Sequence, residues 1–113
     1  MKSINDIIIE GKSGELKKLY MLDILILHGM WKEYKVYGDL FDSFTEEELD
    51  NCEKLCDFLN KCDEDNKRIR FSAVKEYFDI LNKMADYVIN SKSNEFGIHD
   101  KKTWKEIKTY VTK

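Results

Sequence analysis

A chain of 113 residues fits one domain, with enough apolar residues (42%) for a single core and a surface dense in charge (36%). The absence of proline argues against a loop-rich secreted scaffold and favours unbroken helices. The apolar run 7–9 is too short for a secretory signal, and the run 19–27 is shorter than the ~20 residues that span a bilayer. Three cysteines, an odd number, are typical of a reducing compartment. We therefore expect a cytoplasmic protein without membrane contact.

The first predicted element is a short helix over residues 3–10. Gly11 would end it, because glycine accepts the positive φ of a helix C-terminus. The β-branched run Ile7–Ile9 favours a competing structure, an N-terminal hairpin that turns at residues 11–14. The Gly-Lys-Ser string in that turn lacks the preceding glycine of a phosphate-binding loop, and we interpret it as a turn followed by a cap.

A second helix is predicted over residues 14–28. Ser13 can cap its start, and Gly29 would end it. The apolar residues between Leu16 and Leu27 point in nearly every direction. A helix that is apolar on every side is buried on every side, so this segment is the predicted central helix.

Residues 30–44 contain aromatic side chains at three- and four-residue steps, namely Trp31, Tyr34, Tyr37 and Phe41. This spacing indicates a helix, which Gly38 would break or kink. Aromatic side chains at helical spacing are by default core residues, and that is one interpretation of this series.

A helix over residues 45–62 has the clearest start signal in the chain. Thr45 and Glu48 have the spacing of a capping box, in which each side chain bonds the backbone N–H of the other. One face of this helix is apolar, with residues Leu49, Cys52, Leu55, Cys56, Leu59 and Cys62. A polar turn is predicted over 63–66.

Two further helices complete the predicted fold. The first covers 72–91, with Ser72 as its cap, Phe71 packed against its first turn and an unbroken apolar stripe from Val74 to Val88. After a loop at 91–99, Asp100 caps a last helix whose residues Trp104, Ile107 and Val111 face inward. The sequence predicts an all-α fold: one domain, residues 1–113, formed by a bundle of five or six helices around the buried segment 16–27.

Charge is segregated along the chain. Residues 39–65 contain eleven acidic residues and two lysines, whereas residues 66–113 contain eleven basic and six acidic residues. A charge run is most often a solvated helix face. The acidic block also follows the aromatic series, and Trp and Tyr are enriched at the energetic centres of protein interfaces. We therefore predict a non-enzymatic protein-binding module whose partner has a basic surface. The predicted binding site on this chain comprises Trp31, Tyr34, Tyr37, Asp39, Asp42, Glu46, Glu47 and Glu48.

The basic part of the chain predicts an alternative function, nucleic-acid binding through phosphate contacts. The candidate residues are Arg68, Arg70, Lys101, Lys105 and Lys108. A pI near 5.4 argues against it, because nucleic-acid-binding domains are typically basic. Self-association of the bundle is a third interpretation.

No residue pattern predicts catalysis, a metal site or a cofactor. Cys52, Cys56 and Cys62 have the spacing C-x3-C-x5-C on one helix, which is not a zinc pattern, and buried reduced cysteine packs as a small hydrophobic residue. His28 and His99 are isolated in the sequence, so we interpret both as structural.

In its general composition, short, acidic and rich in lysine and isoleucine, the chain resembles the small accessory proteins of phages and other mobile elements of AT-rich bacteria. Many of these bind and block a host protein, including defence nucleases and other nucleic-acid-processing proteins. The resemblance implies an inhibitor and assigns no role to any residue.

Overall fold

The computed structural model describes residues 15–16, 18–65, 69–91 and 101–112, and these form an all-α fold, as predicted. The elements in chain order are β1 (Glu15–Leu16), α2 (Lys18–Tyr34), α3 (Gly38–Phe41), α4 (Glu46–Glu64), β2 (Ile69–Arg70), the 3₁₀ helix η1 (Phe71–Tyr77), α5 (Phe78–Asn90) and α6 (Lys101–Val111). The predicted helix over 3–10, its hairpin alternative, and the Ser13 and Asp100 caps lie outside the described residues.

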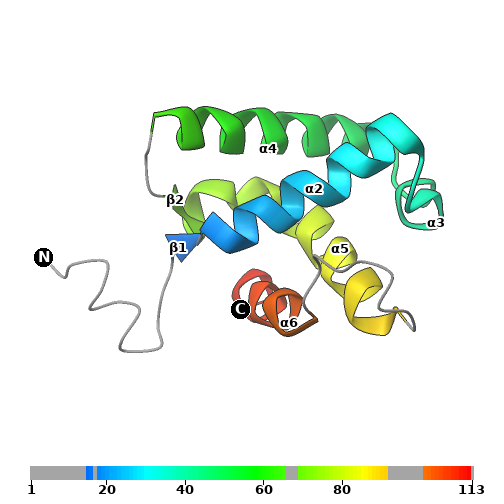
Figure 1. Ribbon diagram of the computed structural model, residues 1–113. Coiled ribbons are helices and arrows are strands. Elements are labelled where there is room, and N and C mark those ends of the chain that lie inside the picture. Colours follow the sequence, from blue (N-terminus) through cyan, green and yellow to red (C-terminus); the bar gives the residue numbers. More distant parts are fainter. Residues whose placement is uncertain (1–14, 17, 66–68, 92–100, 113) are drawn as a thin grey trace, which may run out of the picture.

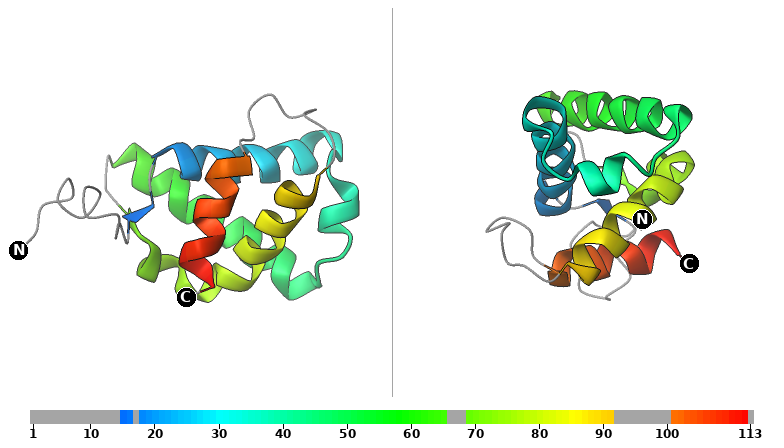
Figure 2. Two further views of the ribbon diagram at one scale, coloured as in Figure 1. Left: turned by 90° about the horizontal axis from the view of Figure 1, so that it is seen from below. Right: turned by 90° about the vertical axis from the view of Figure 1, so that its right-hand side faces the viewer.

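The helices form two packed pairs (Figure 1). Helices α2 and α4 lie side by side and run in opposite directions, joined through α3. Helices α5 and α6 form the second pair, and α6 runs crosswise to α2 beneath the first pair (Figure 2). The two-residue strands β1 and β2 pair antiparallel, with Glu15 opposite Arg70, and so tie the segment before α2 to the segment that follows α4.

Helix α2 differs from the predicted central helix over 14–28 in three ways. It begins only at Lys18, because Glu15–Leu16 form β1, which pairs with β2. It continues through Gly29 to Tyr34, and a Cβ added at Gly29 would meet no atom within 4 Å, so packing does not require glycine there. The helix is also not buried on all sides: Ile24 and Leu27 are fully buried, but Leu22 is 48% exposed. The prediction that this helix is buried on every side, made from its apolar residues, was therefore too high.

The chain breaks between residues 35 and 37, and not at Gly38 as predicted. Lys35 and Tyr37 adopt left-handed backbone conformations, with φ of 58° and 68°. Such conformations are unfavourable for residues with a side chain, and they reverse the chain after α2. Gly38 then begins the short helix α3, whose residues Leu40 and Phe41 are buried.

The start of α4 confirms the capping box. The Thr45 hydroxyl oxygen accepts a hydrogen bond from the Glu48 backbone N–H at 3.1 Å, and the Thr45 N–H donates to a Glu48 carboxylate oxygen at 3.0 Å. The apolar face of α4 is buried as predicted, including Cys52 and Leu59. The helix ends at Glu64, so it takes in the first half of the predicted polar turn.

The predicted continuous helix over 72–91 is wrong at its start. Residues 71–77 form the 3₁₀ helix η1, with a kink at Val74, and α5 begins only at Phe78. Ser72 is exposed and does not cap a helix; the N-cap position belongs to Arg70, without a side-chain cap. The ring of Phe71 stacks on Tyr110 of α6, with centroids 4.5 Å apart, so packing against a distant helix determines this segment.

Helix α6 confirms the predicted inward face, since Trp104 and Ile107 are fully buried and Val111 is buried. An ion pair between Lys108 and Asp86 links α6 to α5 at the surface of that pair. No helix within the described ranges combines the length and apolar character needed to cross a membrane.

Candidate functional site

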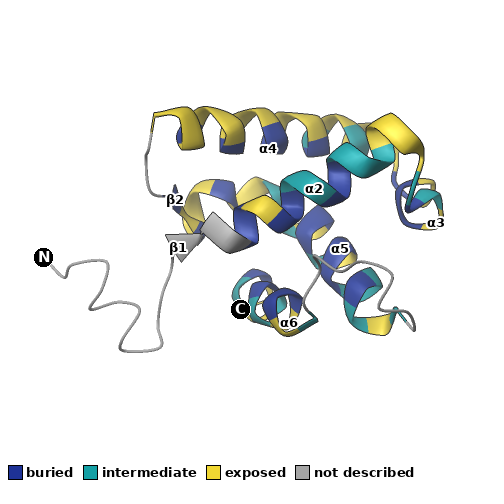
Figure 3. Ribbon diagram, viewed as in Figure 1, coloured by how far each residue is buried: buried dark blue, intermediate teal, exposed yellow. Residues whose placement is uncertain are grey.

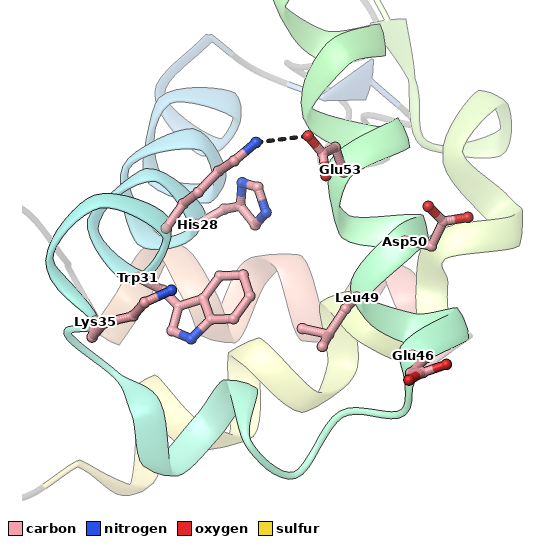
Figure 4. A pocket seen from close by; sticks show the side chains of 8 residues that line it. His28, Trp31, Lys35, Glu46, Leu49, Asp50 and Glu53 are labelled. Atoms are coloured by element: carbon pink, nitrogen blue, oxygen red, sulfur yellow. Dashed lines mark hydrogen bonds and ion pairs between the residues drawn. The ribbon is translucent and has the colours of Figure 1, made fainter.

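A pocket of about 420 Å³ opens between α2 and α4, at the end of the pair nearest α3 (Figure 4). Four residues of α4 and three of α2 line it at the spacings i, i+3, i+4 and i+7, which is one face of a helix, and Lys35 follows directly after α2. The lining residues are His28, Trp31 and Lys32 from α2, Lys35 directly after α2, and Glu46, Leu49, Asp50 and Glu53 from α4. The pocket is therefore the place where one face of α2 meets one face of α4.

One ion pair bridges the two walls of the pocket. The Lys32 ammonium lies 2.6 Å from a Glu53 carboxylate oxygen, and this pair is the dashed contact in Figure 4. The hydrogen bond raises the pKa of Lys32 and lowers the pKa of Glu53, so both groups stay charged at neutral pH. Both side chains remain more than half exposed, so the pair contributes little to stability. It shows which residues of α2 and α4 lie opposite one another.

Trp31 forms the aromatic wall of the pocket. Its ring stacks on Phe41 of α3, with centroids 4.7 Å apart and an interplanar angle of 23°. The Lys35 ammonium lies over the same ring, 5.2 Å from the centroid, a distance at which a cation is attracted to the π face. Trp31 is thus held by contacts within its own chain.

His28 lies deeper in the pocket. It is only 6% exposed, and it makes no hydrogen bond or ion pair with any residue that the structure describes. Burial lowers its pKa, and the nearby Lys32 lowers it further against the opposing effect of Glu53 and Asp57. The imidazole is therefore neutral at neutral pH, with one nitrogen that donates and one that accepts a hydrogen bond.

The outer face of α4 is exposed along its whole length (Figure 3). Among its carboxylates, Asp50 lies 3.4 Å from Lys54 one turn away and Glu53 pairs with Lys32. Glu46, Glu47 and Asp57 are exposed and form no ion pair with a described residue. We call Glu46, Glu47, Asp50, Glu53 and Asp57 the acidic face of α4. It lies directly beside the pocket, which shares three of these residues.

Of the eight predicted protein-binding residues, four lie in the pocket or on the exposed surface beside it. Trp31 and Glu46 line the pocket. Glu47 lies on the acidic face of α4, and Tyr34 is 67% exposed at the end of α2. These four residues are available to a partner.

The other predicted residues are placed less favourably. Tyr37 is 6% exposed and packs edge-on against Tyr87, so it belongs to the core. Asp39 accepts a hydrogen bond from the Tyr87 hydroxyl at 2.8 Å, while Asp42 is exposed at the end of α3. Glu48 is committed to the cap of α4 and to Lys83 of α5, which lies 2.7 Å from its carboxylate.

The alternative basic set is also partly committed. Lys108 pairs with Asp86, and the Lys101 ammonium donates to the Ser91 carbonyl oxygen. Lys105 is exposed on α6 and Arg70 is exposed on β2, while Arg68 lies outside the described residues. Arg70 lines a second pocket of about 680 Å³ at the other end of α4, together with Phe58 and Ile69.

The three cysteines are buried, free thiols. Burial raises the pKa of Cys52 and of Cys56 to about 12, so neither is a thiolate at neutral pH. Among the described residues, no group of three or more His, Cys, Asp or Glu side chains is arranged to hold a metal ion.

Sequence reasoning did not assign a binding role to His28, Lys32, Lys35, Leu49, Asp50 or Glu53, which complete the pocket. A signal was present, because each set follows the i, i+3, i+4, i+7 pattern of one helix face. It could be used only with the knowledge that α2 and α4 are antiparallel neighbours with Lys32 opposite Glu53. No protein-family model matches the chain, and neither a curated protein nor a solved structure matches it.

Proposed function

We propose that this chain is a non-enzymatic protein-binding module that docks the acidic face of α4 and the adjoining pocket on a partner with a basic surface. The observation that supports this most directly is a preformed pocket with a tryptophan wall, bordered by exposed carboxylates. Tryptophan is among the residues most enriched at the energetic centres of interfaces. A rim of one charge steers an oppositely charged partner and raises its association rate.

The charge balance of the region agrees with a basic partner. Helix α4 contains eight acidic residues and two lysines between Glu46 and Glu64. Three of those acids, Glu46, Glu47 and Asp57, have no neutralising partner within the described part of the chain. A basic surface would neutralise them without breaking an existing ion pair.

The chemistry of the pocket favours binding over catalysis. Nucleophilic catalysis needs a nucleophile within hydrogen-bond reach of a base. The thiols of Cys52 and Cys56 are protonated and face the core, and the neutral His28 has neither a described nucleophile nor an orienting group bonded to it. In the proposed function the domain acts by occupying a basic surface, and so by blocking a host protein that uses that surface.

Affinity purification from the host cell, followed by mass spectrometry, tests this function. A Glu47→Lys/Asp57→Lys variant is expected to lose the partner that the wild type recovers. The matched control is Glu76→Lys/Asp79→Lys on η1 and α5, which makes the same charge change and also contains one acid from a first helical turn. Circular dichroism verifies that both variants fold. Equal recovery by both variants would overturn the proposed function.

The alternative function, nucleic-acid binding, retains two exposed basic residues, Arg70 and Lys105. It predicts a gel shift with DNA or RNA at low salt, weakened by added salt and by alanine at these two positions. No shift at low salt would remove this alternative.

A further inference from the structure

We propose that the pocket between α2 and α4 binds an arginine side chain of the partner, and that Lys35 occupies the cation position over Trp31 until the partner replaces it. This inference rests on the proposed function, which requires a basic partner, and it names the side chain that enters the pocket.

The contact between Lys35 and Trp31 shows that the pocket accepts a cation. The ammonium lies 5.2 Å from the ring centroid, within the range of a cation–π interaction. Lys35 is exposed and forms no ion pair with a described residue, although acidic side chains line the facing wall. The internal cation is therefore held by the ring alone and can be displaced at low cost.

Two acceptors on the opposite wall are available to an arriving cation. Glu46 and Asp50 line the α4 side of the pocket as exposed side chains, and their carboxylates are turned away from Trp31 and His28 (Figure 4). Exposed side chains exchange rotamers within nanoseconds, so either carboxylate can turn toward a group that enters the pocket. Glu46 has no ion pair to give up.

His28 adds a polar group to the lining of the pocket. It is nine-tenths buried, lines the pocket and has no hydrogen-bond partner among the described residues. None of the fully buried side-chain atoms that lack a hydrogen-bond partner in the described part of the chain belongs to His28, so the imidazole nitrogens are open to the pocket. A donor that enters the pocket can bond the nitrogen that accepts.

The arrangement fits arginine better than lysine. A guanidinium is planar, so it can stack on an indole while its N–H groups bond a carboxylate in the same plane. It has five donors, so it can bond more than one acceptor of the pocket at once. The ammonium of lysine is a point charge on a flexible stem and can replace Lys35 without gaining these contacts.

The test uses two matched peptides, acetyl-Gly-Arg-Gly-amide and acetyl-Gly-Lys-Gly-amide, titrated into the ¹⁵N-labelled protein. The indole N–H resonance of Trp31 is expected to shift with the arginine peptide and to shift less with the lysine peptide. The resonance of Trp104, which is fully buried in α6, reports the fold and should stay in place.

Two substitutions of Lys35 act in opposite directions. Lys35→Ala removes the internal cation and is expected to tighten the arginine peptide about two- to fivefold, the equivalent of one exposed cation–π contact. Lys35→Arg keeps a cation over Trp31 with a better fit and is expected to weaken the peptide. Equal affinity of the two peptides, or no gain on Lys35→Ala, would overturn the inference.

Failure of this inference is distinguishable from failure of the proposed function. If Glu47→Lys/Asp57→Lys loses the cellular partner but the arginine peptide does not bind, the acidic face is the interface and the pocket is not an arginine site. If the peptide binds and the same double variant keeps its partner, the proposed docking surface is wrong although the pocket binds arginine.

Discussion

The capping box of α4 allows a quantitative prediction, because one side chain serves both the local helix start and the tertiary packing. The Thr45 hydroxyl accepts the Glu48 N–H, and Glu48 bonds back to Thr45 and to Lys83 of α5. Thr45→Ala removes an N-cap acceptor, which costs about 1 kcal/mol of unfolding free energy. For a chain of this size that corresponds to a melting temperature lower by about 4 °C. Thr45→Ser keeps the hydroxyl and is the matched control.

Glu48→Gln separates the cap from the ion pair. Glutamine can still bond the Thr45 N–H, so the cap remains. Loss of the Glu48 charge removes the ion pair with Lys83, which costs about 0.5 kcal/mol because the pair is partly solvated and screened. The hydrogen bonds from Lys83 and Thr45 lower the pKa of Glu48 from 4.5, so the charged form stabilises the fold above that pH. The difference between wild type and Glu48→Gln should close as the pH falls through the lowered pKa of the folded state.

Urea denaturation followed by circular dichroism measures these differences, at neutral pH and again in a series toward acid. The reasoning would be refuted by a Thr45→Ser variant as unstable as Thr45→Ala. It would also be refuted by a Glu48→Gln penalty that persists unchanged at the acid end of the series.

Three further predictions concern the core, the thiols and the buried histidine. Leu59→Ala should lower the unfolding free energy by about 3 kcal/mol, because Leu59 is fully buried. The control Phe58→Ala, at a neighbouring residue that is 37% exposed, should lower it by less than about 1 kcal/mol. Similar losses for both variants in urea denaturation would contradict the assigned faces of α4. Cys52 and Cys56, with pKa values raised to about 12, should resist a thiol-reactive dye at about pH 8 until urea unfolds the protein; labelling of all three thiols in the native state would contradict their burial. The pKa of His28 is lowered from 6.5 in the native state, so the unfolded chain binds a proton more readily and the free energy of unfolding should fall as the pH drops below 6.5. His28→Gln should flatten this part of the plot of unfolding free energy against pH. An unchanged slope in the variant would exclude His28 as the cause.

Local signals predicted the start of α4 well, because a capping box involves residues three positions apart and needs no tertiary information. They failed at Gly29 for the opposite reason. Glycine has a low helix propensity, but the cost is small beside the burial of Ile24, Leu27 and His28 on the same helix. Packing carried the helix past Gly29, and the chain reversed only at the left-handed Lys35.

The stripe from Val74 to Val88 illustrates a second limit. Apolar residues at steps of three and four are compatible with both an α-helix and a 3₁₀ helix, so the sequence could not separate η1 from α5. The contacts that distinguish them are long-range, since Phe71 stacks on Tyr110 of α6 and also meets Tyr20 of α2. Neither neighbour can be identified from the residues around Phe71.

The candidate site combines both limits. Trp31 and Glu46 were predicted from residue type and charge, and both line the pocket. Tyr37 was predicted from the same aromatic series, but the reversal at residues 35–37 turns it into the core. That reversal also places Lys35 over Trp31 and brings α4 back along α2. One backbone feature, which no helix periodicity could reveal, thus leaves Trp31 in the pocket, turns Tyr37 into the core and places the Lys35 ammonium over the Trp31 ring.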